Sequence, residues 1–345
     1  MLISIWFISL GLSLISIMVM LVLVVRRFIS DREQAKYASL QKQLRQQLIS
    51  FTADHDEDAL IVALGKVPPS VAVEASFAFL ELLRGEDRTE IVWALAAAGL
   101  PDHIRQRLKS GNEAQRLSAA EFLTAFSFPE TRVGLVEALH KGTREVRIAA
   151  SISLARLNWL PPLPEVLQAI GPNGQRSRRL IDLFHALSTE RSDEIIAVAV
   201  DGQRPAFLRA SAIDALGRMG QYQFIEAFEE MAHATEPEVA AAAIRAIGLI
   251  GHPRSAEAVV NALRSEAWEV RLEAAEAARK IGVPQARDGL IDLLEDDEWT
   301  VRYMAAKSLL MMGGDNLLAL ETAAMGEASR RQRTASLVLA EGIER

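Results

Sequence analysis

The chain of 345 residues contains no cysteine, few aromatic residues and a deficit of positive charge. Without cysteine there are no disulfide bonds, thiolate nucleophiles, cysteine-based zinc sites or lipoprotein anchors, which fits a reducing compartment. Aromatic residues make up 6% while hydrophobic residues make up 50%, so Ala, Leu, Ile and Val supply most of the apolar material, as in closely packed helices. The net charge of −7 argues against bulk affinity for nucleic acid, which depends on neutralising phosphates.

Signatures of catalysis are also missing. The six histidines occupy unrelated positions, and no pair has the spacing of the zinc motif H-E-x-x-H. Glycine pairs such as Gly217 and Gly220 recur with the repeat described below, whereas a phosphate loop would follow a strand and carry Lys-Ser or Lys-Thr. The acidic run from Asp54 to Asp58 is interpreted as the first turn of a helix, with a metal site as the alternative. We therefore expect no enzyme activity, cofactor, metal or small-molecule substrate.

The first segment is one long apolar run. Residues Leu2 to Val25 include no charged side chain, and a helix of 24 residues spans about 36 Å, enough to cross a ~30 Å hydrocarbon core. Arg26 and Arg27 follow at once, so the positive-inside rule places the rest of the chain in the cytoplasm. We expect residues 1–28 to be a single transmembrane anchor in an inner membrane, with its N-terminus outside. A cleaved signal peptide is the alternative, but its charged start, shorter apolar run and small-residue cleavage site are missing.

Residues 29–50 form a polar, helix-favouring segment with one apolar stripe. Tyr37, Leu40, Leu44 and Leu48 recur every three or four residues. We expect a helical stalk that rests on the first soluble helices, with a short dimerising coiled coil as the alternative.

The dominant signal is a 31-residue repeat that runs from position 115 to position 345. VRYMAAKSLLMMG at Val301 matches VRLEAAEAARKIG at Val270 and VAAAAIRAIGLIG at Val239, and eight copies keep one register. The fifth position is mostly alanine, which lets helices approach closely, and glycine ends several helices. A second apolar helix follows each copy, so each unit is a helical hairpin that buries its apolar face only by stacking. Residues 51–114 are helical but out of register, and we expect divergent hairpins that cap the stack.

Arginine recurs at the second position of the repeat. Because the positive end of a helix dipole disfavours arginine near a helix start, its recurrence indicates a compensating partner. We interpret this column as a structural ladder of bonds from arginine to carboxylates or carbonyls between successive repeats, with acidic neighbours just before it (Glu113, Glu145, Glu238, Glu269 and Glu298); a binding stripe is the alternative. Ala240 interrupts the column, whose members are Arg116, Arg147, Arg178, Arg209, Arg271, Arg302 and Arg333.

These segments resemble HEAT repeats, in particular the short, 31-residue kind of phycobilisome-lyase-like proteins, over residues 115–345. The resemblance implies an all-α fold, a right-handed α-solenoid of the HEAT and armadillo type, here preceded by one transmembrane helix. It implies a scaffold or adaptor more directly than an enzyme. A minority of such proteins attach bilin chromophores, which supplies an alternative function, although no lyase-specific residue is matched.

The middle of the chain departs from the pattern. Proline and glycine interrupt the helices at Trp159–Pro164 and Gly171–Gly174. Arginines concentrate next to this interruption, and we interpret them as a candidate surface for an acidic partner or lipid headgroup, with a solvated basic surface as the alternative: Arg176, Arg178, Arg179, Arg204 and Arg209. Trp268 and Trp299, one period apart, are interpreted as hydrophobic staples, with a peptide-binding groove as the alternative.

Together these features predict a membrane-anchored, cytoplasmic HEAT-repeat scaffold that binds a protein partner. The expected partner is an inner-membrane enzyme complex, for example one that makes envelope polysaccharide or transfers glycosyl groups. Bilin attachment and nucleic-acid binding are the two alternatives, and the acidic net charge argues against the second.

Overall fold

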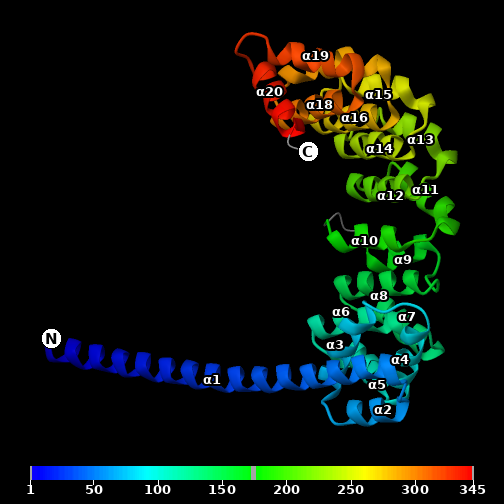
Figure 1. The fold of residues 1–345 in the computed structure, drawn as a ribbon. Coiled ribbons are helices and arrows are strands. Elements are labelled where there is room, and N and C mark those ends of the chain that lie inside the picture. The colour runs from blue at the N-terminus through cyan, green and yellow to red at the C-terminus, as the bar shows by residue number, and fades with distance from the viewer. Residues whose placement is uncertain (1, 172–175, 344–345) are drawn as a thin grey trace. The chain divides into compact units, whose positions relative to one another are not determined.

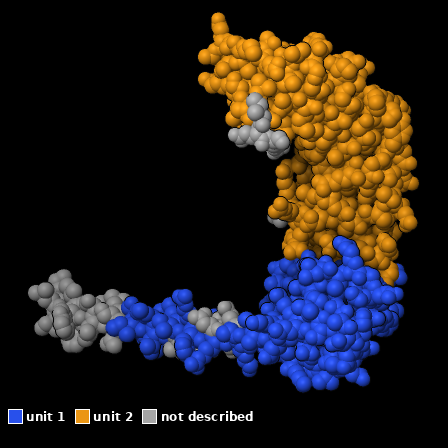
Figure 2. All heavy atoms as spheres, viewed as in Figure 1, with its two compact units in different colours: residues 1–134 blue, residues 135–345 orange. Residues whose placement is uncertain are grey.

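A computed structural model of the protein describes the backbone of residues 2–171 and 176–343, all of whose regular elements are helices (Figure 1). Within this range, the side chains of residues 2–10, 12–15, 25, 29–31, 33–34 and 343 lie outside the description. The chain divides into two compact units, Met1–Gly134 and Leu135–Arg345 (Figure 2). The division falls inside helix α7 (Pro129–Lys141).

Unit 1 begins with one continuous helix, α1 (Leu2–Asp54), which covers both the expected anchor and the expected stalk. The last turns of α1 bury Leu44, Leu48 and Phe51, and α1 packs on two of the helices that follow it. Asp56 caps the next helix and two acidic residues occupy its first turn, as the acidic run predicts. The other elements of unit 1, before α7, are α2 (Glu57–Gly65), α3 (Pro69–Leu80), α4 (Glu86–Ala97), α5 (Leu100–Ser110), α6 (Glu113–Phe122) and η1 (Leu123–Ala125).

Across the part of the chain that the structure describes, no helix is long and apolar enough to cross a membrane. The expected anchor depends on residues 2–25, and many of their side chains lie outside the described residues.

Unit 2 alternates two sets of helices. The inner helices, which follow the inner side of the curve of unit 2 in Figure 1, pack on one another from repeat to repeat, and the outer helices cover their other side. The inner helices are α8 (Arg144–Arg156), α10 (Arg178–Ala186), α12 (Ala206–Arg218), α14 (Pro237–Ile250), α16 (Trp268–Ile281), α18 (Trp299–Met312) and α20 (Arg330–Ile343). The outer helices are α9 (Leu163–Ile170), α11 (Ser192–Val200), α13 (Ile225–Met231), α15 (Ala256–Ala262), α17 (Arg287–Asp292) and α19 (Gly314–Ala324), with short 3-10 turns η2 (Thr189–Arg191), η3 (Tyr222–Phe224), η4 (Pro253–Ser255), η5 (Pro284–Ala286) and η6 (Leu293–Glu295) between elements.

The small residues of the repeat are the points of closest approach. The alanines of the fifth position, such as Ala212 and Ala243, are fully buried. At Gly217 a Cβ atom would lie 2.7 Å from the Cα atom of Ala246 in the next inner helix, so only glycine fits there. Gly251 ends α14 with a φ of 72°, the left-handed conformation expected at a helix end.

Helix α10 breaks the register that the sequence predicts. The 31-residue period places Ile181 and His185 at core positions, but both are exposed, whereas Leu180 and Phe184 are buried. The helix has therefore slipped by one residue relative to its neighbours. The sequence around it, RRLIDLFHAL, offers two overlapping apolar sets, and packing selects the set that buries the phenylalanine.

Candidate interaction surface

The arginine column lies along the turns that join successive repeats. In the middle of unit 2, each arginine donates to carbonyl oxygens at or near the turn that leads into its own helix, and two of them also reach a carboxylate at the equivalent turn one repeat further on. Arg209 Nε donates to the Ala199 carbonyl at 3.0 Å, and its Nη1 lies 3.1 Å from Glu236 Oε1. Arg209 is 8% exposed, so this contact is part of the core.

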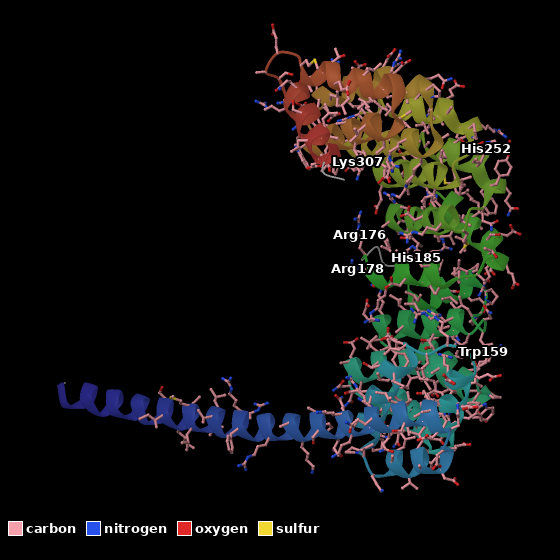
Figure 3. All side chains as sticks on the ribbon, viewed as in Figure 1. Trp159, Arg176, Arg178, His185, His252 and Lys307 are labelled. Carbon is pink, nitrogen blue, oxygen red and sulfur yellow. The ribbon has the colours of Figure 1, made fainter. Side chains whose placement is uncertain are left out.

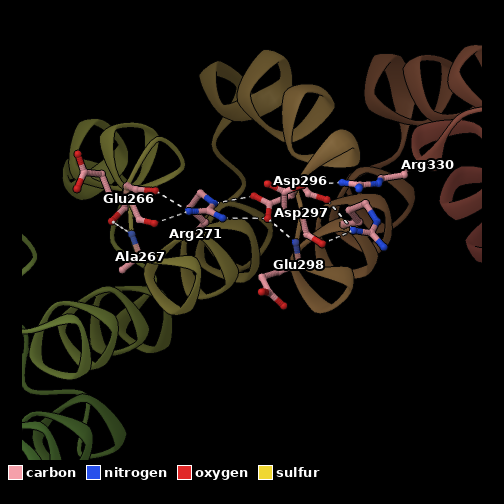
Figure 4. A network of polar contacts seen from close by, with 9 residues as sticks. Glu266, Ala267, Arg271, Asp296, Asp297, Glu298 and Arg330 are labelled. Carbon is pink, nitrogen blue, oxygen red and sulfur yellow. Dashed lines mark hydrogen bonds and ion pairs between the residues drawn. The ribbon is translucent and has the colours of Figure 1, made fainter.

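Arg271 makes the most extensive set of contacts (Figure 4). Its Nη1 donates to the carbonyls of Ser265 and Glu266 at 2.8 and 2.9 Å, while Nε and Nη2 bind both oxygens of Asp296 at 2.6 and 2.9 Å. The side chain of Asp296 is 5% exposed. Burial opposes ionisation of Asp296, but the hydrogen bonds from Arg271 and from Glu298 N–H outweigh burial and lower its pKa. The hydrogen bond to Asp296 in turn raises the pKa of Arg271.

Three other members of the column, Arg116, Arg147 and Arg302, bind backbone carbonyl oxygens. Arg116 Nε donates to the carbonyl oxygen of Leu108. Arg302 Nη1 donates to the backbone carbonyl oxygens of Asp296 and Asp297. Arg147 donates to the Gly142 carbonyl at 2.8 Å and to the carbonyl of Ala169 at 2.6 Å. These carbonyls lie at or near helix ends, where the negative end of the helix dipole offsets the unfavourable position of an arginine near a helix start.

Two of the acidic residues predicted as partners of the column bind arginines elsewhere. Glu145 lies 3.7 Å from Arg179 and Glu238 lies 2.6 Å from Arg176, so two of the expected partners bind arginines outside the column. The carboxylates that do bind the column belong to the turns, at Glu236 and Asp296.

Two arginines of the column do not take part in the ladder. The one-residue slip of α10 places Ser177 where the arginine should be, and its hydroxyl lies 3.4 Å from Glu145 Oε2. Arg178 is consequently exposed, and no hydrogen bond or ion pair joins its guanidinium to another described residue. Arg333 is also exposed, because α20 is the last helix and no further turn follows it within the described residues.

The candidate basic surface is therefore smaller than the sequence predicts. Arg209 lies in the core and cannot reach a partner. Arg176 and Arg179 pair with the glutamates given above, and Arg204 lies 3.1 Å from Asp201. Among the five, Arg178 alone combines exposure with a guanidinium that has no partner in the described part of the chain, and Figure 3 shows it beside Arg176 on the inner side of unit 2.

Two charged clusters were not predicted from the sequence. Arg245 on α14 links three inner helices, since it lies 2.6 Å from Asp214 on α12 and 2.9 Å from Glu273 on α16. Burial alone would lower the pKa of Arg245, but the hydrogen bond from Arg245 to Glu273 and the charges of both carboxylates raise it. Asp214 and Arg245 are one period apart, so opposite charges at one repeat spacing were the available signal.

The second missed cluster holds the proline-rich loop before α9. Arg191 donates to the carbonyls of Leu160 and Pro161 at 3.0 and 2.8 Å and binds both carboxylate oxygens of Glu194. Glu194 accepts a hydrogen bond from Leu163 N–H at the start of α9. The hydrogen bond from Arg191 is the main cause of the lowered pKa of Glu194. This spacing resembles any surface i, i+3 pair, and nothing in the sequence marked it.

The turns also line an open hollow of about 360 Å³ in the repeat that lacks the arginine. Ala240 lines it from α14, and the turns before α14 and before α16 form its walls. A second hollow of about 290 Å³ lies beside Arg204, between residues of α9, α10 and α12. Over the described ranges, no three side chains of the metal-binding types gather as a metal site requires.

The two tryptophans do not form the predicted staples. A staple residue precedes the N-cap, whereas Trp268 and Trp299 are the first residues of α16 and α18 and expose 39% and 52% of their surface. Trp299 stacks on Tyr303 one turn later in the same helix, with ring centroids 5.2 Å apart.

Comparison with solved structures gives neighbours with low identity. A crystal structure of an engineered protein is 17% identical, with a TM-score of 0.38, and the match covers 88% of this chain and 99% of that one. The karyopherin Kap121p is 16% identical, with a TM-score of 0.44 and 87% of this chain covered; the chain spans 41% of the length of Kap121p. Human deoxyhypusine hydroxylase, in complex with glycerol, is 22% identical, with a TM-score of 0.32 and coverages of 77% and 99%.

No curated protein matches the chain. The family model of HEAT repeats matches residues 192–266 and 256–340, the part of unit 2 that contains Arg209, Arg271 and the hollow at Ala240. The chain therefore carries HEAT repeats over residues 192–340.

Proposed function

We propose that this protein is a membrane-anchored scaffold that binds a protein partner along the inner helices of unit 2. The observation that carries the proposal is the exposed guanidinium of Arg178, which has no hydrogen bond or ion pair with another described residue. The slip of α10 releases this arginine from the ladder and exposes it at the inner side, where it has no partner among the described residues. Arginine offers five donors in a rigid fork and is enriched at the energetic centres of protein interfaces, so a partner carboxylate is its natural acceptor.

The residues next to Arg178 favour a specific contact with one partner group over general attraction to a negatively charged surface. Arg176 and Arg179 are already paired with Glu238 and Glu145, which neutralises much of the local positive charge. A nucleic acid would require many free cations along one face, and the net charge of −7 opposes it. One arginine that has no partner in the described part of the chain, between two arginines that are paired, instead suits a single acidic group on a folded partner.

The membrane anchor belongs to the same proposal. In α1, each of the residues Ile17 to Val24 exposes between 53% and 68% of its surface. A contiguous exposed apolar surface of this kind requires a nonaqueous cover or a partner. An anchor that places the inner membrane around residues 2–25 and unit 2 in the cytoplasm would confine the scaffold to two dimensions and raise its effective concentration near membrane enzymes. Such an enzyme complex, for instance one that builds envelope polysaccharide, is the partner we propose.

The absence of cysteine makes the anchor and its orientation directly testable. A single cysteine introduced at the exposed residue Glu257 should react with a membrane-impermeant maleimide only after the cells are opened, and deletion of residues 2–25 should release the protein from the membrane fraction. Labelling of intact cells would place the repeats outside, and membrane retention after the deletion would contradict the anchor.

Crosslinked co-purification from the native cell tests the scaffold, with the parent compared with Arg178→Glu. The matched control is Arg156→Glu in the last turn of α8, since Arg156 is also exposed and has no ion pair among the described residues. We expect a membrane enzyme to be captured by the parent and by the control and to be lost from Arg178→Glu. Capture that survives Arg178→Glu would remove Arg178 from the interface, and failure of the parent to capture a specific protein would contradict the scaffold.

The 31-residue period also motivates a second hypothesis, attachment of a bilin chromophore, because it resembles the short repeats of phycobilisome-lyase-like proteins. Under this hypothesis the protein without residues 2–25 would still transfer an added bilin to an acceptor protein. Absence of any covalent bilin adduct in that assay would leave the scaffold as the proposed function, and we expect that outcome.

A further inference from the structure

At Ala240, where the arginine column is interrupted, the space that an arginine would occupy is a hollow, because neighbouring side chains do not fill it. The hollow of about 360 Å³ has Ala240 on one side and the turn residues Ala234, Thr235, Ser265 and Glu266 around it. Its volume lies in the range of pockets that hold small ligands, and it is far larger than the ~30 Å³ of one water molecule.

One repeat further on, the equivalent space is occupied by the chain's own arginine. Arg271 stands one repeat period after Ala240, and it binds the carbonyls of Ser265 and Glu266 and the carboxylate of Asp296 (Figure 4). The residues one period earlier than these three acceptors are Ala234, Thr235 and Ser265, and all three line the hollow. Ser265 stands in the place of Asp296 and has no carboxylate, but the next residue, Glu266, also lines the hollow and supplies one. In the preceding repeat Arg209 fills the corresponding place. The hollow thus has the frame of an arginine site without its arginine.

The acceptors of this frame have no donor among the described residues. In the described part of the chain, no hydrogen bond occupies the carbonyl oxygens of Ala234 and Thr235, and the carboxylate of Glu266 has no ion pair. Neither lysine nor arginine is among the described residues that line the hollow. The group that would satisfy two carbonyls and a carboxylate at once is a planar cation with several donors, as the arrangement around Arg271 demonstrates.

The surroundings of the hollow are suited to a protein partner. Trp268 follows the lining residue Ala267 and exposes 39% of its surface, and aromatic side chains are enriched where proteins bind one another. Lysine would fill the frame less well, because its ammonium group is a compact charge that cannot bind the separate acceptors bidentately.

We propose that the hollow at Ala240 is a binding site for an arginine side chain of the partner protein. The partner's guanidinium would occupy the missing step of the ladder, donating to the carbonyls of Ala234 and Thr235 and pairing with Glu266. This inference rests on the proposed scaffold function, and it adds an anchor point that is separate from Arg178. Together the two sites require a partner that carries both a carboxylate and an arginine.

A peptide titration of the full-length protein in detergent micelles tests the site. The probe is a fluorescein-labelled glycine–serine peptide with one arginine, read by fluorescence polarisation, and the comparison peptide has lysine in its place. The variants are Ala240→Arg, which supplies the chain's own guanidinium, and Glu266→Gln, which removes the carboxylate charge. Glu257→Gln is the matched control, because Glu257 is exposed on α15 but does not line the hollow.

The arginine peptide is expected to bind the parent and the Glu257→Gln control equally. Its Kd should rise roughly tenfold or more for Ala240→Arg, for Glu266→Gln and for the lysine peptide, the loss that follows when one charge-assisted hydrogen bond is removed. Absence of binding to the parent in the low-millimolar range, equal binding of the two peptides, or unchanged binding by Glu266→Gln would each overturn the inference. Glu266→Gln keeps the shape of the side chain, so it decides the question even if Ala240→Arg does not fold.

The same variants separate this inference from the scaffold itself. In cells, capture of the same membrane protein by the parent and by Ala240→Arg would leave the scaffold standing and overturn the role of the hollow. Loss of capture in Ala240→Arg and in Glu266→Gln, but not in Glu257→Gln, would support both.

Discussion

Substitution of alanine for Arg271 removes the best-connected step of the ladder. The change deletes two hydrogen bonds to Asp296, at 2.6 and 2.9 Å, and two further bonds to carbonyls of the preceding turn. The side chains of Arg271 and Asp296 are 17% and 5% exposed, so water can replace the lost donor only in part. The variant therefore leaves a buried carboxylate that retains a hydrogen bond from the backbone N–H of Glu298.

The size of the effect follows from this burial. Removal of one partner of a buried ion pair costs about 3–5 kcal/mol of unfolding free energy, whereas loss of an exposed pair costs ~0–1 kcal/mol. Because Asp296 keeps one donor and Arg271 is not fully buried, we expect the lower end of the first range, about 3 kcal/mol. A binding stripe on the surface, the alternative interpretation of the column, would predict a change near zero.

Hydrogen exchange is the most direct assay, because long repeat arrays can open in parts and a single unfolding midpoint then has no clear meaning. Amide protection should fall in α16 and α18 and remain unchanged in α8 and α10. The pH dependence supplies a second readout. The lowered pKa of Asp296 means that its contribution is present above its ordinary value of 3.8 and is lost as the pH falls through the folded-state value. The difference between the variant and the parent should therefore shrink in acid.

Arg264→Ala is the matched control, since Arg264 is exposed near the same turn and has no ion pair among the described residues. The Arg264→Ala variant should change the free energy of opening, measured by hydrogen exchange in α16 and α18, by less than about 0.5 kcal/mol. If Arg271→Ala had the protection of the parent in α16 and α18 while partner capture disappeared, the ladder would be refuted and the column would be a binding stripe.

Three further perturbations test other parts of the fold. Gly217→Ala places a Cβ atom 2.7 Å from the backbone of Ala246 and should lower the unfolding free energy by about 1–3 kcal/mol; an unchanged urea midpoint would refute the close approach of α12 and α14. The ion pair of His55 with Glu90, 2.7 Å long, raises the pKa of His55, so its stabilising effect is full below the unfolded value of 6.5 and is lost as the pH rises through the folded value. His55→Gln should abolish this pH dependence of thermal unfolding, and a parent whose midpoint does not vary from pH 6 to 8 would contradict it. Glu194→Gln should speed proteolysis in the proline-rich loop before α9, because Leu163 N–H and Arg191 lose a charged acceptor. An unchanged cleavage rate would show that Glu194 does not hold the loop in place.

Much of the repeat could be predicted because its constraints are local and recur. Positions such as Ala212 and Ala243 must be small wherever two inner helices touch, and the same residue type therefore returns once in every repeat period. Gly251 ends α14 in the left-handed conformation that glycine adopts most readily, which also leaves a mark in the sequence. The arginine column was visible for the same reason.

The partners of the column were not predictable in the same way. Acidic residues occur both in the turns and in the first turns of the inner helices, and spacing alone favoured the second group. The fold brings Glu236 and Asp296 to the guanidinium groups instead, because the turn of one repeat lies beside the first helical turn of the repeat before it. The candidate basic surface shrank for a related reason, since burial of Arg209 depends on neighbours 10 and 27 residues away.

What the sequence alone determined is the architecture: a helical hairpin that recurs with the 31-residue period, with small residues at the contacts and arginine beside the turns. Only the tertiary structure decided where one helix departs from the repeat register and where a position of the arginine column is left empty. The slip of α10 exposes Arg178, because two overlapping apolar sets compete for the core and packing of Phe184 chooses between them. The hollow at Ala240 exists because the flanking turns keep the spacing set by the repeats on either side, even where the arginine that would fill it is missing.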